Sequence, residues 1–170
     1  MSEEKKAAAT RYHRKTLLET ADRLLMQYGY DGMNMNMLAK EAGYSKATVY
    51  VYLESKDEIV RLLCIERLKL LKKEFAVILK NGGTSEEMFE AISSVLDEFS
   101  SEDKTYFDFI CGSAFADEDS DASDSEKQLS ALVNGIFDEL TKLAPAAELK
   151  RKWYLYYGKK MTAKLFGTSD

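Results

Sequence analysis

The sequence predicts an all-α protein, and three features support that prediction. Apolar residues recur at intervals of three and four, and no segment alternates with the period of two that a half-buried strand shows. The 170 residues include a single proline and nine glycines, so long helices are seldom interrupted. Glycines and good N-cap residues stand between the apolar stretches, where helices would end and begin. We therefore expect about eight helices, three short ones in an N-terminal head and five in a C-terminal body.

The head is expected to span residues 10–56, after a flexible start at residues 1–9. Its first helix ends at Gly29, where a C′ glycine would stop it, and Asn34 caps a short second helix. Gly43 follows at a tight turn, because a left-handed backbone is easiest for glycine, and Ser45 caps a third helix. The apolar face of the first helix consists of Leu17, Leu18, Ala21, Leu24, Leu25 and Tyr28.

The body is expected to span residues 57–170. It opens with a long helix that starts near Ser55 and stops at the glycine pair 82–83. Thr84 and Glu87 have the spacing of a capping box, which opens a fifth helix. The apolar stripe of the long helix consists of Ile59, Leu62, Leu63, Leu70, Leu71, Phe75, Ile78 and Leu79.

The second half of the body contains an aromatic-rich helix over residues 103–116 and then an acidic, solvated loop over residues 116–126. Two amphipathic helices follow, one on each side of Pro145. Pairing them with the same helices of a second subunit would give a four-helix interface around a two-fold axis. Burial of both faces inside the body is the alternative. The expected dimer face consists of Leu129, Leu132, Val133, Ile136, Phe137, Leu140, Trp153 and Tyr157.

Charge is distributed unevenly along the chain. Residues 5–56 carry nine Lys and Arg against five Asp and Glu, whereas residues 61–170 carry fifteen against twenty. A basic head on an acidic body suggests that the head alone meets a polyanion, although a solvated surface would show the same charges.

Several function classes are disfavoured by what the sequence contains. His13 is the only histidine, and Cys64 and Cys111 are isolated, so we expect no metal site, no catalytic triad and no cofactor. No apolar run approaches the roughly 20 residues that cross a bilayer. The N-terminus also lacks the apolar segment of a secretory signal. We therefore expect a cytoplasmic protein that makes no membrane contact and is not an enzyme.

The second and third helices, joined by a turn at Gly43, have the dimensions of a helix-turn-helix. In that motif the second helix lies in the major groove and presents its N-terminal residues to bases and phosphates. Ser45 and the free N–H groups of the following turn suit a phosphate oxygen, and the methyl group of Ala47 suits a thymine methyl. Val49 and Leu53 point the other way, into the core of the head.

Hydroxyl and ammonium groups follow along the same segment. Together they would hold the phosphates that flank a groove, and this would explain why basic residues are concentrated here. For either tyrosine alone, burial in the core is an equal alternative. The donors are Lys46, Thr48, Tyr50, Tyr52 and Lys56.

Between residues 10 and 60 the chain carries an ordered series of motifs without a gap. They are an Arg-rich start, Leu-Leu-x-x-Ala-x-x-Leu-Leu, Tyr-Gly-Tyr, Leu-Ala-x-x-Ala-Gly, Ser-Lys-Ala-Thr-Val-Tyr and Leu-Glu-Ser-Lys-Asp-Glu. This series resembles the TetR family of transcriptional regulators. The resemblance implies an all-helical homodimer with a variable C-terminal ligand-binding and dimerisation domain. It also implies that DNA is faced by Ser45, Lys46, Ala47, Thr48, Tyr50, Tyr52 and Lys56.

Some positions depart from the family pattern. The second helix opens with Met-Asn-Met-Asn-Met, in which Asn34 still caps and Asn36 would reach a phosphate or an adenine edge. Tyr44 stands where the family generally has a small aliphatic residue, and Leu53 where it generally has phenylalanine.

We therefore expect a sequence-specific repressor that binds a palindromic operator in double-stranded DNA and is released by a small apolar or aromatic effector. An all-helical enzyme and a protein-interaction module are the alternatives; the first lacks a compact catalytic constellation, and the second would not need an intact Gly43 turn and Lys56. Tyr106 is the expected hydrogen-bond partner of the effector. The expected effector site consists of Phe75, Met88, Phe89, Tyr106, Phe109 and Phe115, for each of which plain core packing is the alternative.

Overall fold

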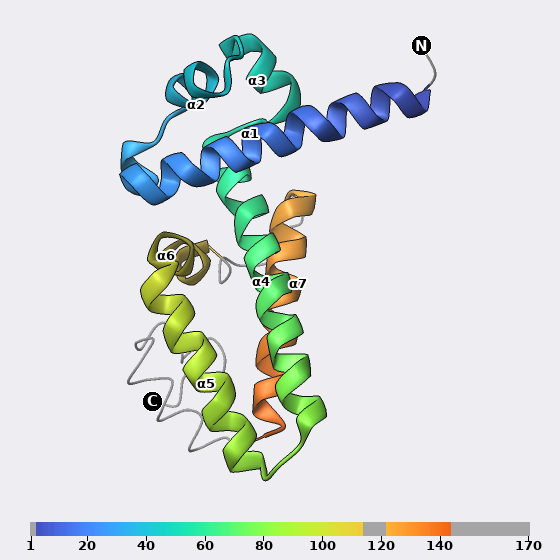
Figure 1. The fold of residues 1–170 in the computed structure, drawn as a ribbon, viewed down its shortest axis with the longest axis vertical. Coiled ribbons are helices and arrows are strands. Elements are labelled where there is room, and N and C mark those ends of the chain that lie inside the picture. The colour runs from blue at the N-terminus through green and yellow to red at the C-terminus, as the bar shows by residue number, and fades with distance from the viewer. Residues whose placement is uncertain (1–2, 114–121, 144–170) are drawn as a thin grey trace. The chain divides into compact units, whose positions relative to one another are not determined.

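The computed structural model describes residues 3–113 and 122–143 (Figure 1). Within these ranges the chain forms seven α-helices and no strand, which confirms the all-α prediction. The helix expected after Pro145 lies outside the described residues. In chain order the helices are α1 (Glu3–Gly32), α2 (Met35–Ala42), α3 (Lys46–Tyr52), α4 (Lys56–Asn81), α5 (Ser85–Glu102), α6 (Lys104–Ser113) and α7 (Asp124–Thr141).

The chain divides into two compact units, Met1–Leu63 and Cys64–Asp170. The boundary between them lies inside α4. The first residues, which the sequence led us to expect as a flexible segment, are helical from Glu3 onward. The limits of the head and the body given above stay predictions.

The N-terminal unit is built on α1, which packs against both α2 and α3. The backbone of α1 is interrupted at Gly29 (φ 70°, ψ 178°), where the sequence predicted the end of the first helix. The inward position expected for Tyr28 is wrong, because its side chain, directly before this interruption, is 48% exposed. The core of the unit consists of Leu17, Ala21, Leu24, Leu25, Met33, Leu38, Ala39, Val49, Leu53, Ile59, Val60 and Leu63.

The predicted caps of the two short helices are confirmed. Asn34 accepts hydrogen bonds from the backbone N–H groups of Asn36 and Met37, each at 3.0 Å. Gly43 ends α2 in the left-handed conformation (φ 74°, ψ 25°), and its N–H donates to the carbonyls that α2 leaves unpaired. Met33 before the cap and Leu38 on the first turn are fully buried, which are the two positions of a hydrophobic staple.

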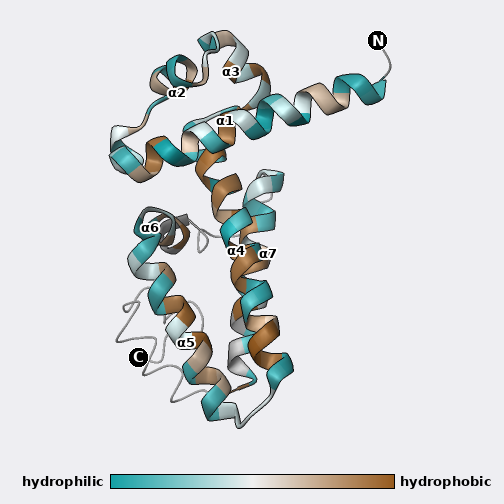
Figure 2. Ribbon diagram, in the orientation of Figure 1, coloured by the Kyte–Doolittle hydropathy of each residue, from teal (hydrophilic) through white to brown (hydrophobic). Residues whose placement is uncertain are grey.

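The C-terminal unit contains most of α4. The predicted inward position of Leu70 is wrong, because its side chain is 57% exposed. The buried face of α4 runs instead through Cys64, Leu68, Leu71 and Phe75 at intervals of four and three, and residue 70 falls outside that row. Figure 2 shows the same alternation of apolar and polar residues along α5. The buried residues of α5 to α7 are Phe89, Ile92, Leu96, Phe99, Tyr106, Ile110, Leu129, Val133 and Ile136.

The capping box that the sequence predicted at the start of α5 is present. The backbone N–H of Thr84 donates to the carboxylate of Glu87 at 2.8 Å, and the backbone N–H of Glu87 donates to the Thr84 hydroxyl at 3.2 Å. The hydrogen bonds that Thr84 donates stabilise the charged carboxylate, so the pKa of Glu87 is lowered.

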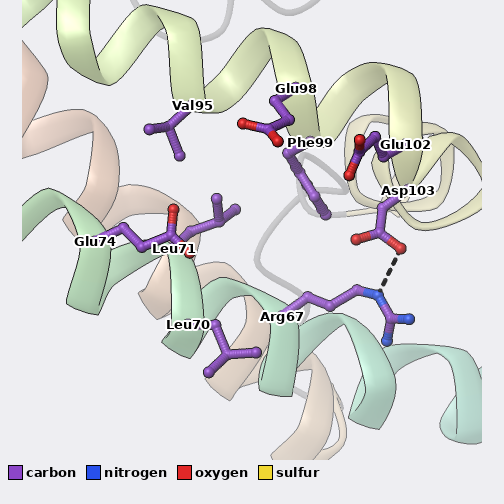
Figure 3. A pocket seen from close by; sticks show the side chains of 9 residues that line it. All are labelled: Arg67, Leu70, Leu71, Glu74, Val95, Glu98, Phe99, Glu102 and Asp103. Carbon is purple, nitrogen blue, oxygen red and sulfur yellow. Dashed lines mark hydrogen bonds and ion pairs between the residues drawn. The ribbon is translucent and has the colours of Figure 1, made fainter.

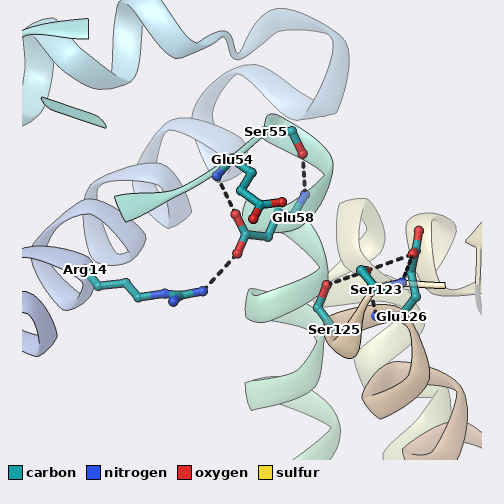
Figure 4. A network of polar contacts seen from close by, with 7 residues as sticks. All are labelled: Arg14, Glu54, Ser55, Glu58, Ser123, Ser125 and Glu126. Atoms are coloured by element: carbon teal, nitrogen blue, oxygen red, sulfur yellow. Dashed lines mark hydrogen bonds and ion pairs between the residues drawn. The ribbon is translucent and has the colours of Figure 1, made fainter. Parts of the chain in front are cut away.

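The last described helix begins earlier than expected. Asp124 starts α7, so the end of the predicted acidic loop is helical. The cause is a local cap, in which the backbone N–H of Ser123 donates to the carboxylate of Glu126 at 2.8 Å (Figure 4). An ion pair of 3.6 Å between Lys72 and Glu139 joins α7 to α4, which run side by side in Figure 1.

Candidate functional site

The helix-turn-helix consists of α2 and α3, which pack against each other and against α1. Ser45 caps α3 by accepting a hydrogen bond from the backbone N–H of Thr48 at 3.0 Å, and the two hydroxyls lie 2.7 Å apart. Val49 and Leu53 are fully buried, as predicted. The opposite side of α3 is therefore the side that is available to a partner.

The exposed side of α3 carries four side chains in two neighbouring rows. Lys46 and Tyr50 are one helical turn apart, and the Lys46 ammonium lies 6.0 Å from the centre of the Tyr50 ring, which is 46% exposed. Ala47 and Val51 form the second row, and Val51 is 77% exposed. A cation and a phenol thus stand beside two apolar groups on one surface.

Tyr52 is held in place by a contact with α1. It is half-buried, and its ring lies 5.3 Å from the ring of His13 on α1, measured between centroids. His13 also has its Nδ1 atom 2.6 Å from the Tyr44 hydroxyl, in the turn before α3. The phenol of Tyr52 is thus positioned by contacts within the unit.

Lys56 is tied to the end of α1. Its ammonium donates to the backbone carbonyl of Tyr30 at 3.0 Å and lies 4.0 Å from the centre of the Tyr30 ring. The Tyr30 hydroxyl donates to Asp57, and this hydrogen bond, followed by burial, raises the pKa of Tyr30 to about 12. Lys56 is half-buried, so its charge is fixed at the start of α4.

A second contact joins α1 to α4 within the N-terminal unit. The guanidinium of Arg14 pairs with the carboxylate of Glu58 at 2.9 Å (Figure 4). The other oxygen of Glu58 accepts the backbone N–H of Glu54 at 2.5 Å, and the backbone N–H of Glu58 donates to the Ser55 hydroxyl at 3.0 Å. Glu58 therefore links α1 to the segment that joins α3 to α4.

The two predicted asparagines differ in role. The side chain of Asn34 is committed to capping α2. Asn36, on the first turn of α2, is exposed. Among the predicted DNA-facing residues, Thr48, Tyr52 and Lys56 are half-buried. The exposed ones are Asn34, Asn36, Ser45, Lys46, Ala47 and Tyr50.

A cavity of about 210 Å³ lies between α4 and α5 in the C-terminal unit (Figure 3). Its apolar surface comes from two leucines, a valine and a phenylalanine, and its polar surface from four carboxylates and one guanidinium. The guanidinium of Arg67 is already paired with Asp103 at 3.0 Å and lies 3.7 Å from the centre of the Tyr106 ring. The lining residues are Arg67, Leu70, Leu71, Glu74, Val95, Glu98, Phe99, Glu102 and Asp103.

The residues predicted for an effector site do not line this cavity. Phe75, Phe89 and Tyr106 are buried in the core of the unit, as the packing alternative anticipated. Met88 and Phe109 are half-buried, and Phe115 lies outside the described residues. The cavity is lined by other residues of α4 and α5, and the predicted effector site stays a prediction.

The predicted dimer face is partly accounted for within the chain. Leu129, Val133 and Ile136 of α7 are buried in the C-terminal unit, and Leu132 is half-buried. The side chains of Phe137 and Leu140, and the whole of Trp153 and Tyr157, fall outside what the structure describes.

Among the described residues, no group of three or more histidine, cysteine, aspartate or glutamate side chains is arranged to hold a metal ion. Burial raises the pKa of the Cys64 thiol to about 12, and its sulfur donates weakly to the Tyr106 carbonyl at 3.8 Å. Cys64 is thus a packing residue. In the same ranges, none of the helices has the length and apolar character that a bilayer crossing needs.

Residues 17–63 match the family model described as bacterial regulatory proteins, tetR family. The N-terminal region of the chain is thus similar to the N-terminal domain of the TetR family. A curated relative, the uncharacterized HTH-type transcriptional regulator YhgD of Bacillus subtilis, is 31% identical over 61 residues. That match covers 36% of this chain and only 32% of the relative, so this chain spans about a third of the relative's length in the match.

Solved TetR-family structures share the fold of the chain. Thermus thermophilus FadR, a repressor in complex with lauroyl-CoA, superposes with a TM-score of 0.60 at 18% identity, covering 89% of each chain. AibR, in complex with isovaleryl coenzyme A and operator DNA, gives a TM-score of 0.58 at 16% identity, covering 91% of this chain and 80% of AibR. Identities this low establish the fold and nothing about the ligand.

Two residues of this TetR-type domain escaped the sequence analysis. Val51 is exposed on α3, and its spacing of four from Ala47 would have placed it on the DNA-facing side. His13 was treated as part of an exposed basic terminus, whereas it contacts Tyr44 before α3 and Tyr52, the last residue of α3. No spacing rule links residue 13 to residues 44 and 52, because the contact depends on how α1 and α3 cross.

Proposed function

We propose that the chain is a homodimeric repressor that binds a palindromic operator through α3 and leaves it when a small effector occupies the C-terminal unit. The observation that carries the proposal is the exposed side of α3, capped at its N-terminus and lined by Lys46, Ala47, Tyr50 and Val51. It lies within residues 5–56, which carry nine Lys and Arg against five Asp and Glu. The similarity of residues 17–63 to the tetR family model supports the same conclusion.

The chemistry of α3 divides between phosphate and base contacts. Lys46 and Tyr50 offer a cation and a hydroxyl, which suit the phosphates that position a protein on the duplex. Ala47 and Val51 are apolar and exposed, which suits thymine methyl groups in the major groove. The charge of Lys56 attracts the phosphates from its fixed position. The hydrogen bonds between Ser45 and Thr48 stabilise the first turn of α3.

A homodimer follows from operator binding by a helix of this size. One α3 reads only a few base pairs, and two copies related by a two-fold axis would read both halves of a palindrome. Because Leu129, Val133 and Ile136 are buried within the chain, the remaining contact must come from Leu132 and from residues beyond it. Sedimentation at micromolar concentration tests this, and a single species of 19.3 kDa would contradict the dimer.

The effector is proposed to bind in the cavity between α4 and α5. Because α4 continues into the N-terminal unit, a molecule that shifts α4 would change the spacing of the two DNA-binding domains. By linkage, the effector would then bind the DNA-free protein more tightly, by the same factor by which it weakens DNA binding. At about 210 Å³ the cavity takes a small molecule or one end of a longer one.

The lining narrows the chemistry of this effector. Glu74, Glu98 and Glu102 have no cationic partner among the described residues, and the one guanidinium is paired with Asp103. An apolar body with a positively charged or hydrogen-bond-donating group therefore fits better than the acyl-CoA molecules bound to FadR and AibR, which carry negative phosphates.

The DNA-binding part is tested with a duplex that the wild-type protein selects from a randomised library. Lys46→Ala should weaken binding and lower the slope of log Kd against log salt by about one, the value of one phosphate contact. Lys73→Ala is the matched control, because it removes an exposed charge from the C-terminal unit. If the alanine variants of Lys46, Tyr50 and Lys56 all bind as tightly as wild type, the assignment of α3 is wrong.

The effector part is tested with two molecules that share a twelve-carbon tail, dodecyltrimethylammonium and lauroyl-CoA, both below the concentration at which they form micelles. The cation should release the selected duplex, and Glu98→Gln should raise the concentration required. Glu86→Gln, which changes an exposed residue outside the cavity, should leave it unchanged. Release by lauroyl-CoA alone would contradict the proposed chemistry without affecting the DNA-binding assignment.

A further inference from the structure

The cavity between α4 and α5 already holds a cation of the protein's own, the guanidinium of Arg67. Its Nε atom donates to the Asp103 carboxylate at 3.0 Å, and its central carbon lies 3.7 Å from the centre of the Tyr106 ring. In Figure 3 the Arg67 side chain reaches from α4 to Asp103 at the end of α5. A carboxylate and an aromatic face thus meet one positive group.

Both contacts of the guanidinium lie mostly out of solvent. The Arg67 side chain is 18% exposed, and Tyr106 is fully buried. Hydrogen bonds and cation–π contacts are stronger where water is excluded, and an aromatic face is the surface on which proteins recognise organic cations. Asp103 and Tyr106 therefore form a cation subsite, which the protein fills with its own arginine.

The two partners of Arg67 are fixed by the backbone. The N–H of Asp103 donates to the Phe99 carbonyl at 3.0 Å, which ends α5. The Asp103 carbonyl accepts the N–H groups of Tyr106 and Phe107 at 2.9 and 3.0 Å, which opens α6. The Arg67 side chain has several rotatable bonds, so it can leave the subsite while the carboxylate and the ring stay in place.

The rest of the lining selects what can replace the guanidinium. Glu74 of α4 and Glu98 and Glu102 of α5 line the same cavity as Asp103. Without Arg67, these four carboxylates would repel one another, so the arginine leaves only when another cation takes its place. An incoming anion would meet the carboxylates, whereas an incoming cation restores the lost charge.

We propose that Arg67 is the specificity-determining residue of the effector site, because only a positively charged molecule can displace it from Asp103 and Tyr106. The assignment, which rests on the proposed function, places the positive group of the effector on this carboxylate and this ring. The apolar part of the effector then lies against the leucines, valine and phenylalanine of the lining. Displacement also removes a contact between α4 and the corner that joins α5 to α6, and this gives the effector a way to shift α4.

The experiment measures the affinity of the full chain for dodecyltrimethylammonium by isothermal titration calorimetry. DNA is absent, and the probe stays below the concentration at which it forms micelles. Arg67→Met keeps an apolar stem but has no charge, so it leaves the subsite empty. This variant should bind the cation roughly tenfold more tightly than wild type, because a cation–π contact no longer has to be broken first.

Three controls separate the subsite from general effects. Lys73→Met is the matched variant, because it removes the same charge from an exposed position of α4 outside the cavity, and it should change the affinity far less. Asp103→Asn added to Arg67→Met removes the carboxylate of the subsite and should cancel the gain. Laurate, an anion with a tail of the same length, should bind Arg67→Met no more tightly than wild type.

Circular dichroism spectra show whether each variant is folded, and Arg67→Gln replaces the methionine variant if that one is not. An affinity for the cation that is unchanged or lower in the folded variant would overturn the role of Arg67. An equal gain in Lys73→Met would do the same, since net charge alone would then explain the result.

Laurate binding that is present in wild type and lost in Arg67→Met would also overturn the role, because Arg67 would then bind an anion. None of these results bears on the assignment of α3 to DNA. A chain that selects no duplex but shows the tenfold gain would contradict the proposed repressor and leave the cation subsite standing.

Discussion

Replacing Gly29 by alanine should destabilise the N-terminal unit more than replacing Gly43, although both glycines have a positive φ. A Cβ atom at either position would meet nothing within 4 Å, so the difference is a matter of backbone conformation alone. Gly43 lies in the left-handed helical region (φ 74°, ψ 25°), where an alanine costs about 1–2 kcal/mol. Gly29 (φ 70°, ψ 178°) lies where glycine is essentially the only residue found, at a cost of about 3 kcal/mol.

Alanine also restricts the unfolded chain, which offsets the strain by about 0.4–1 kcal/mol in each case. We therefore expect a net loss of about 2 kcal/mol for Gly29→Ala and of about 0.5–1 kcal/mol for Gly43→Ala. Asparagine tolerates the left-handed helical region, so Gly43→Asn should be milder than Gly43→Ala, whereas Gly29→Asn should gain nothing over Gly29→Ala.

The assay is urea unfolding of the full chain, followed by far-ultraviolet circular dichroism, with the free energy of unfolding compared across the four variants. Binding to the selected duplex provides a second measurement, because the turn at Gly43 sets the angle between α2 and α3. Equal losses at the two positions, or a larger loss at Gly43, would refute the reasoning from φ and ψ. So would an asparagine at residue 43 that is no better tolerated than alanine.

Three further outcomes are expected. Glu58→Ala leaves Arg14 and the backbone N–H of Glu54 without a partner, so it should lower the stability of the N-terminal unit by about 1–2 kcal/mol in the same urea assay. The control variant Glu66→Ala breaks only an exposed ion pair and should change the stability by less than about 0.5 kcal/mol. Tyr30 stabilises the fold below its ordinary pKa of 10.0 and loses that contribution as pH rises toward about 12, so the free energy of unfolding should fall over this range in wild type and less in Tyr30→Phe. Burial raises the pKa of the Cys64 thiol to about 12. In a Cys111→Ser background, Cys64 should therefore react with a disulfide reagent at pH 8 only as fast as the C-terminal unit opens. Rapid reaction of the folded protein would contradict this prediction.

The helix ends were predictable because their signals are local. The side chains of Asn34, Ser45 and Thr84 each accept hydrogen bonds from backbone N–H groups two or three residues later, so both partners of the interaction lie within four consecutive residues. Gly43 follows the same logic at the end of α2. At Ser123 the capping interaction with Glu126 has the same spacing, and the acidic composition of the segment concealed it.

The environments of individual side chains were harder to predict, because they depend on how helices cross. Lys56 was expected to face phosphate, yet its ammonium is bound by the carbonyl and ring of Tyr30, 26 residues earlier. Tyr52 was expected in the same row, and its ring lies against the ring of His13 in a tilted arrangement. Leu70 belongs to an apolar stripe when α4 is considered alone, but the packing of neighbouring helices determines which residues of that stripe are buried.

The DNA-facing surface and the cavity differ in the same way. The residues proposed to meet DNA lie on a single short helix, α3, so they can be found by their order in the chain. The cavity lies between α4 and α5, and its lining combines Glu74 of α4 with Glu98 and Glu102 of α5, a combination that neither sequence segment signals by itself. An identity of 18% to a solved structure establishes the shared fold and does not establish the residues that line a cavity. For this chain the chemistry of the proposed effector therefore has to be derived from the residues that line its own cavity, and their carboxylates favour a positively charged molecule.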